Sequence, residues 1–211
     1  MAITDEELLE EIQYTMLEPP DGGFTWPSGM WYRVEIFDYV HQRQNRFIKE
    51  THLQLGIDDV PFTALNGRAA LPFDWIATVR AVWIGSDGTR KVLMRGDSWQ
   101  ADYGYPTWSL TSGVPKIYMD AETPTLTLQV APIPTVSGTV HLYFIPLYPP
   151  LDLGGDVMAL PDEFVWCVKY GVMADMFRKI GLNQDPTRAD YCESRYQMGV
   201  EVAKILLEGW A

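Results

Sequence analysis

The chain has few of the residues on which enzyme chemistry usually depends. It contains three histidines and two cysteines among 211 residues. None of them follows the His-Glu-x-x-His, Cys-x-x-Cys or His-x-His spacing of a metal site. The glycine-rich phosphate loops and the Gly-x-Ser-x-Gly nucleophile motif are missing as well. His141 falls on the outward side of a predicted strand, where an exposed histidine is expected. We therefore expect no enzymatic activity, no metal and no cofactor.

Positive charge is also scarce, because 16 Lys and Arg face 28 Asp and Glu, for a formal net charge of -12. This charge disfavours free binding to DNA or to an anionic membrane, although an acidic wall would let DNA slide past without sticking. No run reaches the roughly 18 uncharged apolar residues of a membrane span, since Lys169 and Asp175 interrupt the best candidate. The acidic N-terminus does not resemble a secretory signal, so synthesis in a reducing cytosol is expected. There, Cys167 and Cys192 are expected to be buried thiols, in preference to a disulfide or a metal site.

Apolar periodicity predicts two helices in the N-terminal part, residues 1–56. Thr4 and Glu7 form a capping box ahead of the first helix. The second helix is expected over residues 28–55, with Gly56 as its C-terminal stop. Its middle, residues 41–46, is polar, so only its ends are expected to pack.

From Leu71 the apolar period changes to two, which predicts a β block over residues 71–148. Leu126, Leu128 and Val130 alternate with polar residues, which indicates a sheet with one buried and one wet face and hence an antiparallel sheet. Strands are expected over 79–84 and 90–94, joined by a tight turn, and over 117–119, 125–130 and 139–145.

Two further helices are predicted over residues 160–211, the first ending near residue 181 and the second beginning at Asp185-Pro186. Strands clustered between two sets of helices, without β-α-β alternation, predict the α+β class and a single domain over residues 1–211. The first of the two helices is apolar almost all round, and such a helix must be buried in its own domain or against a neighbouring chain.

Aromatic residues are the one residue class that is enriched, and four of them lie close together in one segment. Such a cluster forms a small core under a loop, anchors a protein interface, or stacks on sugars or bases. Few basic residues lie nearby, which makes base stacking the weakest of these readings. A carbohydrate- or ligand-binding β module is therefore the alternative function. The cluster comprises Trp99, Tyr103, Tyr105 and Trp108.

The order of several short motifs resembles the tail adaptor (head-to-tail connector) proteins of tailed bacteriophages, over nearly the whole chain. Each motif alone is ordinary, and the resemblance lies in the ordered set. The motifs are Leu71-Pro72-x-Asp74-Trp75, then Gly113-x-Pro115-x-x-Tyr118, then Leu160-Pro161-x-Glu163-Phe164 followed by Tyr170-Gly171.

This resemblance implies a structural virion protein of the neck that forms a ring of twelve copies. It implies that the ring binds the portal protein on one side and tail or nozzle proteins on the other, and lines the DNA exit channel. The aromatic cluster would then meet the tail or another partner. Subunit or portal contacts would come from the third helix and the C-terminal tail, at Phe164, Val168, Val172, Leu206, Leu207 and Trp210.

Overall fold

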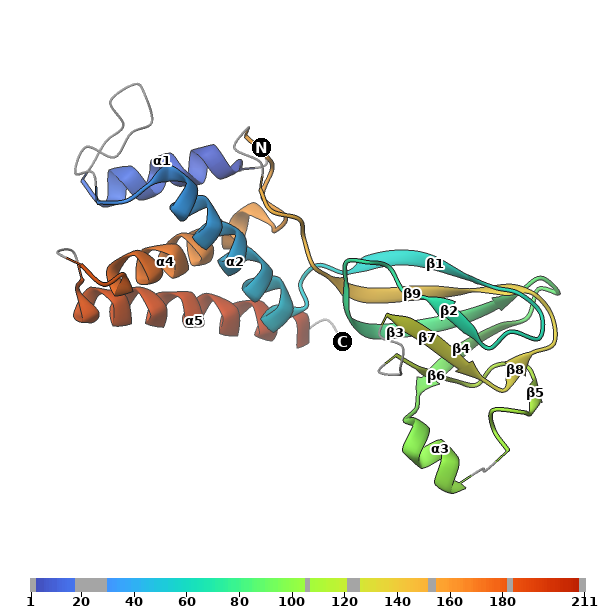
Figure 1. Cartoon of the computed structure of the whole chain (residues 1–211). Helices are drawn as coiled ribbons and strands as arrows, with labels where there is room; N and C mark the ends of the chain where they lie inside the picture. Colours follow the sequence, from blue (N-terminus) through green and yellow to red (C-terminus); the bar gives the residue numbers. More distant parts are fainter. Residues whose placement is uncertain are drawn as a thin grey trace. The chain divides into compact units, whose positions relative to one another are not determined.

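The computed structural model describes residues 3–17, 30–104, 107–120, 126–151, 155–181 and 184–208. Helices stand at both ends of the chain and strands in the middle (Figure 1). The elements are α1 (Asp5–Thr15), α2 (Arg33–Thr51), β1 (Gly56–Phe62), β2 (Arg68–Ala70), β3 (Trp75–Gly85), β4 (Arg90–Arg95), α3 (Ser98–Gly104), β5 (Ser112–Gly113), β6 (Ile117–Met119), β7 (Thr127–Ala131), β8 (Ile133–Pro134), β9 (Gly138–Pro146), α4 (Asp162–Arg178) and α5 (Pro186–Glu208).

The chain forms two compact units. The helical unit combines Met1–Gln54 with Tyr148–Ala211, and the strand unit is Leu55–Leu147. The helices before and after the strands therefore pack together, and the strand unit is inserted between them in the sequence. The predicted α+β class is confirmed, with N-terminal helices, central strands and a C-terminal helix pair. That the whole chain folds as a single domain stays a prediction.

Local sequence signals place the helix ends in the helical unit. Thr4 accepts a hydrogen bond from the Glu7 amide, and the Glu7 side chain accepts one from the Thr4 amide, which is the predicted capping box. α4 begins directly after Pro161 with Asp162 and Glu163, whose charges suit the positive end of the helix dipole. α5 begins at Pro186, as predicted.

The second helix is shorter than the sequence predicts. α2 begins at Arg33 and ends at Thr51, and His52 closes it in the left-handed conformation, so Gly56 is not its stop but the first residue of β1. The predicted start at Ser28 lies outside the described residues. The prediction that only the ends of this helix pack is wrong, because Arg43 and Gln44 in its polar middle are buried.

The sheet of the strand unit is mixed, although most of its pairs are antiparallel. Within the described residues it has seven strands in the order β1-β9-β3-β4-β6-β7-β2, and β4 and β6 run parallel. The predicted hairpin joins β3 to β4, and Gly88 supplies the positive φ that its turn requires. β5 and β8 form a separate parallel pair.

The strand prediction missed β1 and β2, which lie before Leu71 at the two edges of the sheet. β1 carries two aspartates and Pro61, which hide its alternation but suit an edge strand. The clean alternation expected along β7 is also wrong. Leu126 lies before the strand, has a positive φ and is exposed. Gln129 is buried, because β7 has a neighbouring strand on each side, and its side chain accepts a hydrogen bond from Arg68.

α4 and α5 approach each other closely at Gly199. A Cβ atom added there would overlap Cys167 Sγ and lie 2.8 Å from Cys167 Cβ. Cys167 and Cys192 are both buried and free, as predicted. Because Cys167 belongs to the packed face of α4, the two helices must separate or rotate to admit a side chain at position 199.

We predict that Gly199→Ala destabilises the chain by up to about 2 kcal/mol, because an overpacking cost of about 1–3 kcal/mol is only partly offset by the roughly 1 kcal/mol that alanine contributes to a helix interior. Urea unfolding followed by far-UV circular dichroism measures the loss. Combining Gly199→Ala with Cys167→Ala removes the clashing sulfur and should recover part of it. A single variant as stable as the wild type would contradict this packing.

Candidate functional site

The predicted contact residues of α4 lie inside the helical unit. Val168 and Val172 are fully buried and Phe164 is nearly so, and the Phe164 ring lies 5.6 Å from the ring of Phe47 in α2. The burial that this apolar helix requires is therefore supplied by α1, α2 and α5 of the same chain. Contact of these side chains with a neighbouring copy stays a prediction, and none of them stands at the surface of the helical unit.

The end of α5 is different, because its apolar residues face outward. Leu206 and Leu207, both predicted contact residues, are exposed. Trp210, the third predicted contact of the tail, lies outside the described residues. The C-terminal turns of α5 thus hold predicted contact residues that a partner can reach.

A longer exposed stripe precedes them on α5, and we name it the α5 stripe. It consists of Tyr191, Met198, Val202 and Ile205, which are 59%, 47%, 43% and 67% exposed. With Arg195 these residues follow one another in steps of four, three, four and three along the helix. Such spacing keeps side chains on one face and is typical of seams between helices. The α5 stripe is therefore suited to receive another helix.

Aromatic rings extend the α5 stripe onto the neighbouring helix. Trp166 and Tyr170 of α4 meet edge to face, with ring centroids 6.2 Å apart, and Tyr170 meets Tyr191 in the same way at 6.4 Å. The Arg195 guanidinium lies 5.8 Å from the centroid of the Trp166 ring and 5.4 Å from that of Tyr170. These contacts hold a cation and three rings in place before any partner arrives.

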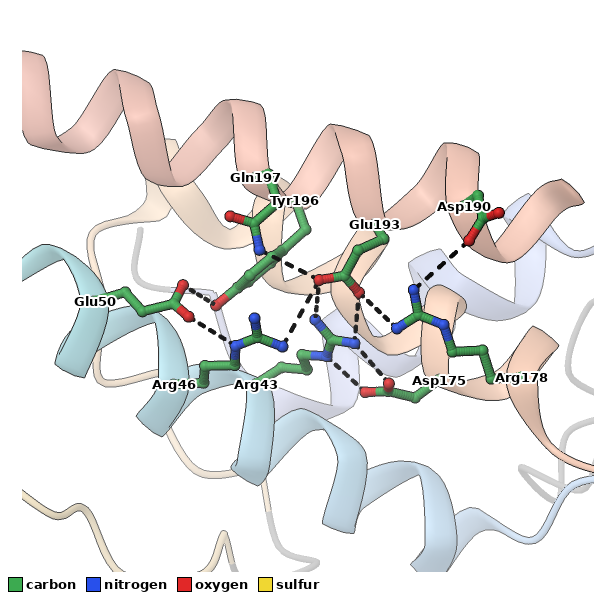
Figure 2. A network of polar contacts seen from close by, with 9 residues as sticks. All are labelled: Arg43, Arg46, Glu50, Asp175, Arg178, Asp190, Glu193, Tyr196 and Gln197. Carbon is green, nitrogen blue, oxygen red and sulfur yellow. Dashed lines mark hydrogen bonds and ion pairs between the residues drawn. The ribbon is translucent and has the colours of Figure 1, made fainter. Parts of the chain in front are cut away.

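On its other side, α5 joins a network of charged residues centred on Arg43 of α2 (Figure 2). Arg43 Nε and Nη2 donate to the two carboxylate oxygens of Asp175 in α4, each at 2.6 Å. Its Nη1 and Nη2 donate to the carboxylate of Glu193 in α5, at 3.2 and 2.8 Å. Arg178 also pairs with Glu193. One guanidinium therefore links three helices through two bidentate pairs.

The electrostatics of the network favour its charged form. Burial alone would raise the pKa of Glu193, but the hydrogen bonds and the charge of Arg43 outweigh it and lower this pKa to about 2. The Tyr196 ring lies under both Arg43 and Arg46, with guanidinium carbons 5.0 and 5.5 Å from its centroid. Burial raises the pKa of Tyr196, which keeps its hydroxyl neutral and able to donate to Glu50.

Sequence reasoning missed this network because its partners are far apart in the chain. Asp175 lies 132 residues and Glu193 lies 150 residues beyond Arg43. The available signal was the apolar run of α4, which Asp175 interrupts with a charge that needs a partner if the helix is buried.

The predicted aromatic cluster is only partly assembled. Trp99 and Tyr103 of α3 are 83% and 95% exposed, and Trp108 donates its indole hydrogen to Asp102 at 2.6 Å. Tyr105 lies outside the described residues. The reading of a small core under a loop does not suit Trp99 or Tyr103, since both point into solvent. The carbohydrate- or ligand-binding alternative stays a prediction.

The sequence predicts an exposed His141, and its side chain is 28% exposed. Its Nδ1 lies 2.6 Å from Asp59 Oδ1 on the neighbouring strand β1. Across the described part of the chain, no three His, Cys, Asp or Glu residues converge in a way that could hold a metal ion. Within the same ranges, no helix is long and apolar enough to cross a membrane.

We predict that Arg43→Ala destabilises the folded chain by about 3–5 kcal/mol, because Asp175 loses the arginine that pairs with it and Glu193 keeps only Arg178 and the more distant Arg46. Arg43→Lys keeps the charge but loses the forked geometry, and should lose less. Arg188→Ala is the matched control, because that exposed arginine pairs with Asp185, three residues away, and its loss should cost below about 1 kcal/mol. Denaturant unfolding measures all three, and equal losses for Arg43→Ala and Arg188→Ala would contradict the bracing role.

We also predict that stability falls as the pH drops from about 4.5 to about 2, the ordinary and the folded-state pKa of Glu193. In this window the unfolded chain binds the proton more tightly than the folded chain, so protonation favours unfolding. Glu193→Gln should be less stable near neutral pH and show a flatter acid limb. Unfolding free energies measured at several pH values test this. An acid limb equally steep in wild type and variant would place the acid sensitivity elsewhere.

No curated protein matches this chain. The family model described as SU10 adaptor protein matches residues 6–205, which leaves only short segments at either end outside the match. The predicted resemblance to phage tail adaptors is thereby confirmed. The chain belongs to the SU10 adaptor protein family and is a structural adaptor protein of a phage.

Proposed function

We propose that this chain assembles into a ring beneath the portal and joins the phage head to the tail. Its place in the virion would be the neck, after synthesis in the host cytoplasm. The single observation that carries the proposal is the apolar surface left open on α5 in a chain of an adaptor family. Apolar side chains repeated along one exposed helical face favour burial against another protein.

The contacts are proposed to divide between the two units. The α5 stripe, together with Leu206, Leu207 and Trp210, would serve contacts among copies and with the portal. Trp99 and Tyr103 project from the strand unit and would anchor a tail or nozzle protein, because exposed aromatic residues are the side chains that most often dominate protein interfaces.

The channel of such a ring would conduct DNA without binding it tightly. The formal net charge of -12 supports this role, since an acidic wall repels phosphate groups and leaves the duplex free to move. The structural role also accounts for a chain without recognisable catalytic motifs.

We predict that native mass spectrometry of the purified chain mixed with the portal protein of the same phage detects a ring of twelve copies bound to the portal. The chain measured alone reports whether assembly requires the portal. The portal of an unrelated phage is the matched control and should recruit no ring.

A chain that stays monomeric both alone and with its own portal would contradict the proposal. In that case the exposed aromatic residues of α3 would become the place to look for a small ligand. Tryptophan fluorescence titrated with host polysaccharides would then test the carbohydrate alternative, since Trp99 is open to solvent.

A further inference from the structure

We infer that the α5 stripe of one copy receives helix α1 of the next copy in the ring. This inference rests on the proposed ring, and assigns the pair of surfaces that would close it. The two surfaces are Tyr191, Met198, Val202 and Ile205 on α5, and Glu7, Glu10, Tyr14 and Leu17 on and directly after α1.

α1 and α5 lie on opposite sides of α4 in the helical unit (Figure 1). α4 contacts α5 at Gly199, and it contacts α1 through the ion pair of Lys169 with Glu11. The α5 stripe lies beside Trp166 and Tyr170 of α4, and the exposed residues of α1 lie on the side of that helix away from the core, so they are two separate surfaces of the helical unit. One copy can therefore offer its α1 surface to the α5 stripe of the next copy.

Ring geometry requires two different surfaces of this kind. A patch that binds its own copy has two-fold symmetry and closes at two chains, whereas head-to-tail contact between unlike patches extends to a closed ring. Contact of one α5 stripe with another would therefore make a dimer. Contact of α5 with α1 satisfies the requirement, since each copy offers one surface of each type.

The apolar parts of the two surfaces match. Tyr14 and Leu17 are 61% and 87% exposed at the end of α1, although both are large apolar residues. Glu7 and Glu10 stand before them, and α1 contains no lysine or arginine. The outer side of α1 is therefore an acidic helical face that ends in two exposed apolar side chains. The α5 stripe is apolar, with Arg195 in its run on the side of α4 and Glu201 along its other border.

Arg195 supplies the charge that such an acidic face needs. Among the described residues, the other arginines of the helical unit each pair with a carboxylate, whereas no carboxylate pairs with Arg195. The buried Nε of Arg195 also has no hydrogen-bond partner within those residues. Its guanidinium is held on Trp166 and Tyr170 beside the α5 stripe. A glutamate of α1 from the next copy would supply the missing counter-charge.

Cross-linking between the two edges tests the inference on the full-length chain. We expect the doubly substituted Tyr14→Cys/Val202→Cys protein, assembled alone or on the portal and treated with a flexible bis-maleimide, to give a ladder of covalent dimers, trimers and higher species. The native Cys167 and Cys192 are buried, and burial raises the pKa of both thiols, so they should not react.

Three controls define the contact. Tyr14→Cys alone and Val202→Cys alone should each give only monomers, because a head-to-tail contact never brings two identical positions together. Tyr14→Cys/Lys204→Cys, with the second cysteine on the polar side of α5, should give no ladder. A ring without a ladder from the main pair, or dimers from Val202→Cys alone, overturns the inference but leaves the ring intact. No ring under either condition overturns the proposed function, and this inference with it.

A charge substitution gives an independent readout. Val202→Asp should raise the concentration needed for half-maximal assembly by at least roughly ten-fold, since it buries an unpaired carboxylate at the contact. Lys204→Glu changes the charge by more, but on the polar side, and should assemble like the wild type. Both positions are exposed, so circular dichroism and the unfolding midpoint should stay unchanged. Normal assembly of a folded Val202→Asp protein overturns the assignment of α5.

Discussion

The helical unit depends on a buried guanidinium that is held between two carboxylates from other helices. Arg43 comes from the N-terminal half of the chain, whereas Asp175 and Glu193 come from the C-terminal half. Gly171 leaves the space through which the Arg43 side chain passes, because a Cβ there would lie 2.9 Å from Arg43 Cδ. Burying an unpaired charge is so costly that α2, α4 and α5 are confined to the arrangement in which both carboxylates reach it. The network thus sets the register of the two halves of the unit, which the strand unit separates by 93 residues (Leu55–Leu147).

The same network determines which side of α5 remains open. Glu193 and Tyr196 turn toward α2, and Gly199 lies against α4, so the rotation of α5 about its own axis is fixed. The α5 stripe must then point away from the core. A surface held in this way loses little conformational entropy when a partner arrives, and stacking of Arg195 on two rings adds to that preorganisation. One side of α5 therefore stabilises the helical unit, and the other side is available for assembly.

Signals that act over a few residues predicted much of the fold. The capping box at Thr4, the proline before α4 and the turn at Gly88 each depend on neighbours within four residues, and each lies where the sequence indicates. The failures involve partners far away in the chain. The polar middle of α2 indicates an exposed segment, but Arg43 is buried there because Asp175 and Glu193 pair with it. The sequence of β1 does not indicate a strand, because its strand conformation depends on pairing with β9. The sequence could not show that the aromatic residues of α3 and the α5 stripe are exposed. Apolar residues of the core have the same composition, and composition does not reveal whether a side chain is buried.

The burial of α4 changes which residues argue for assembly. A helix that is apolar all round requires cover, but α1, α2 and α5 of the same chain supply it, so its composition is explained without any neighbour. The α5 stripe is not explained in this way, because its apolar side chains repeat at the spacing of a helical seam and remain in water. Isolated apolar side chains at a surface are ordinary. The α5 stripe is continuous, and among the described residues no carboxylate pairs with the neighbouring Arg195. Together these two features are typical of a surface that binds a partner. Residues that are buried within their own chain give little information about partners. The exposed apolar residues of α5 are therefore the observation that supports assembly.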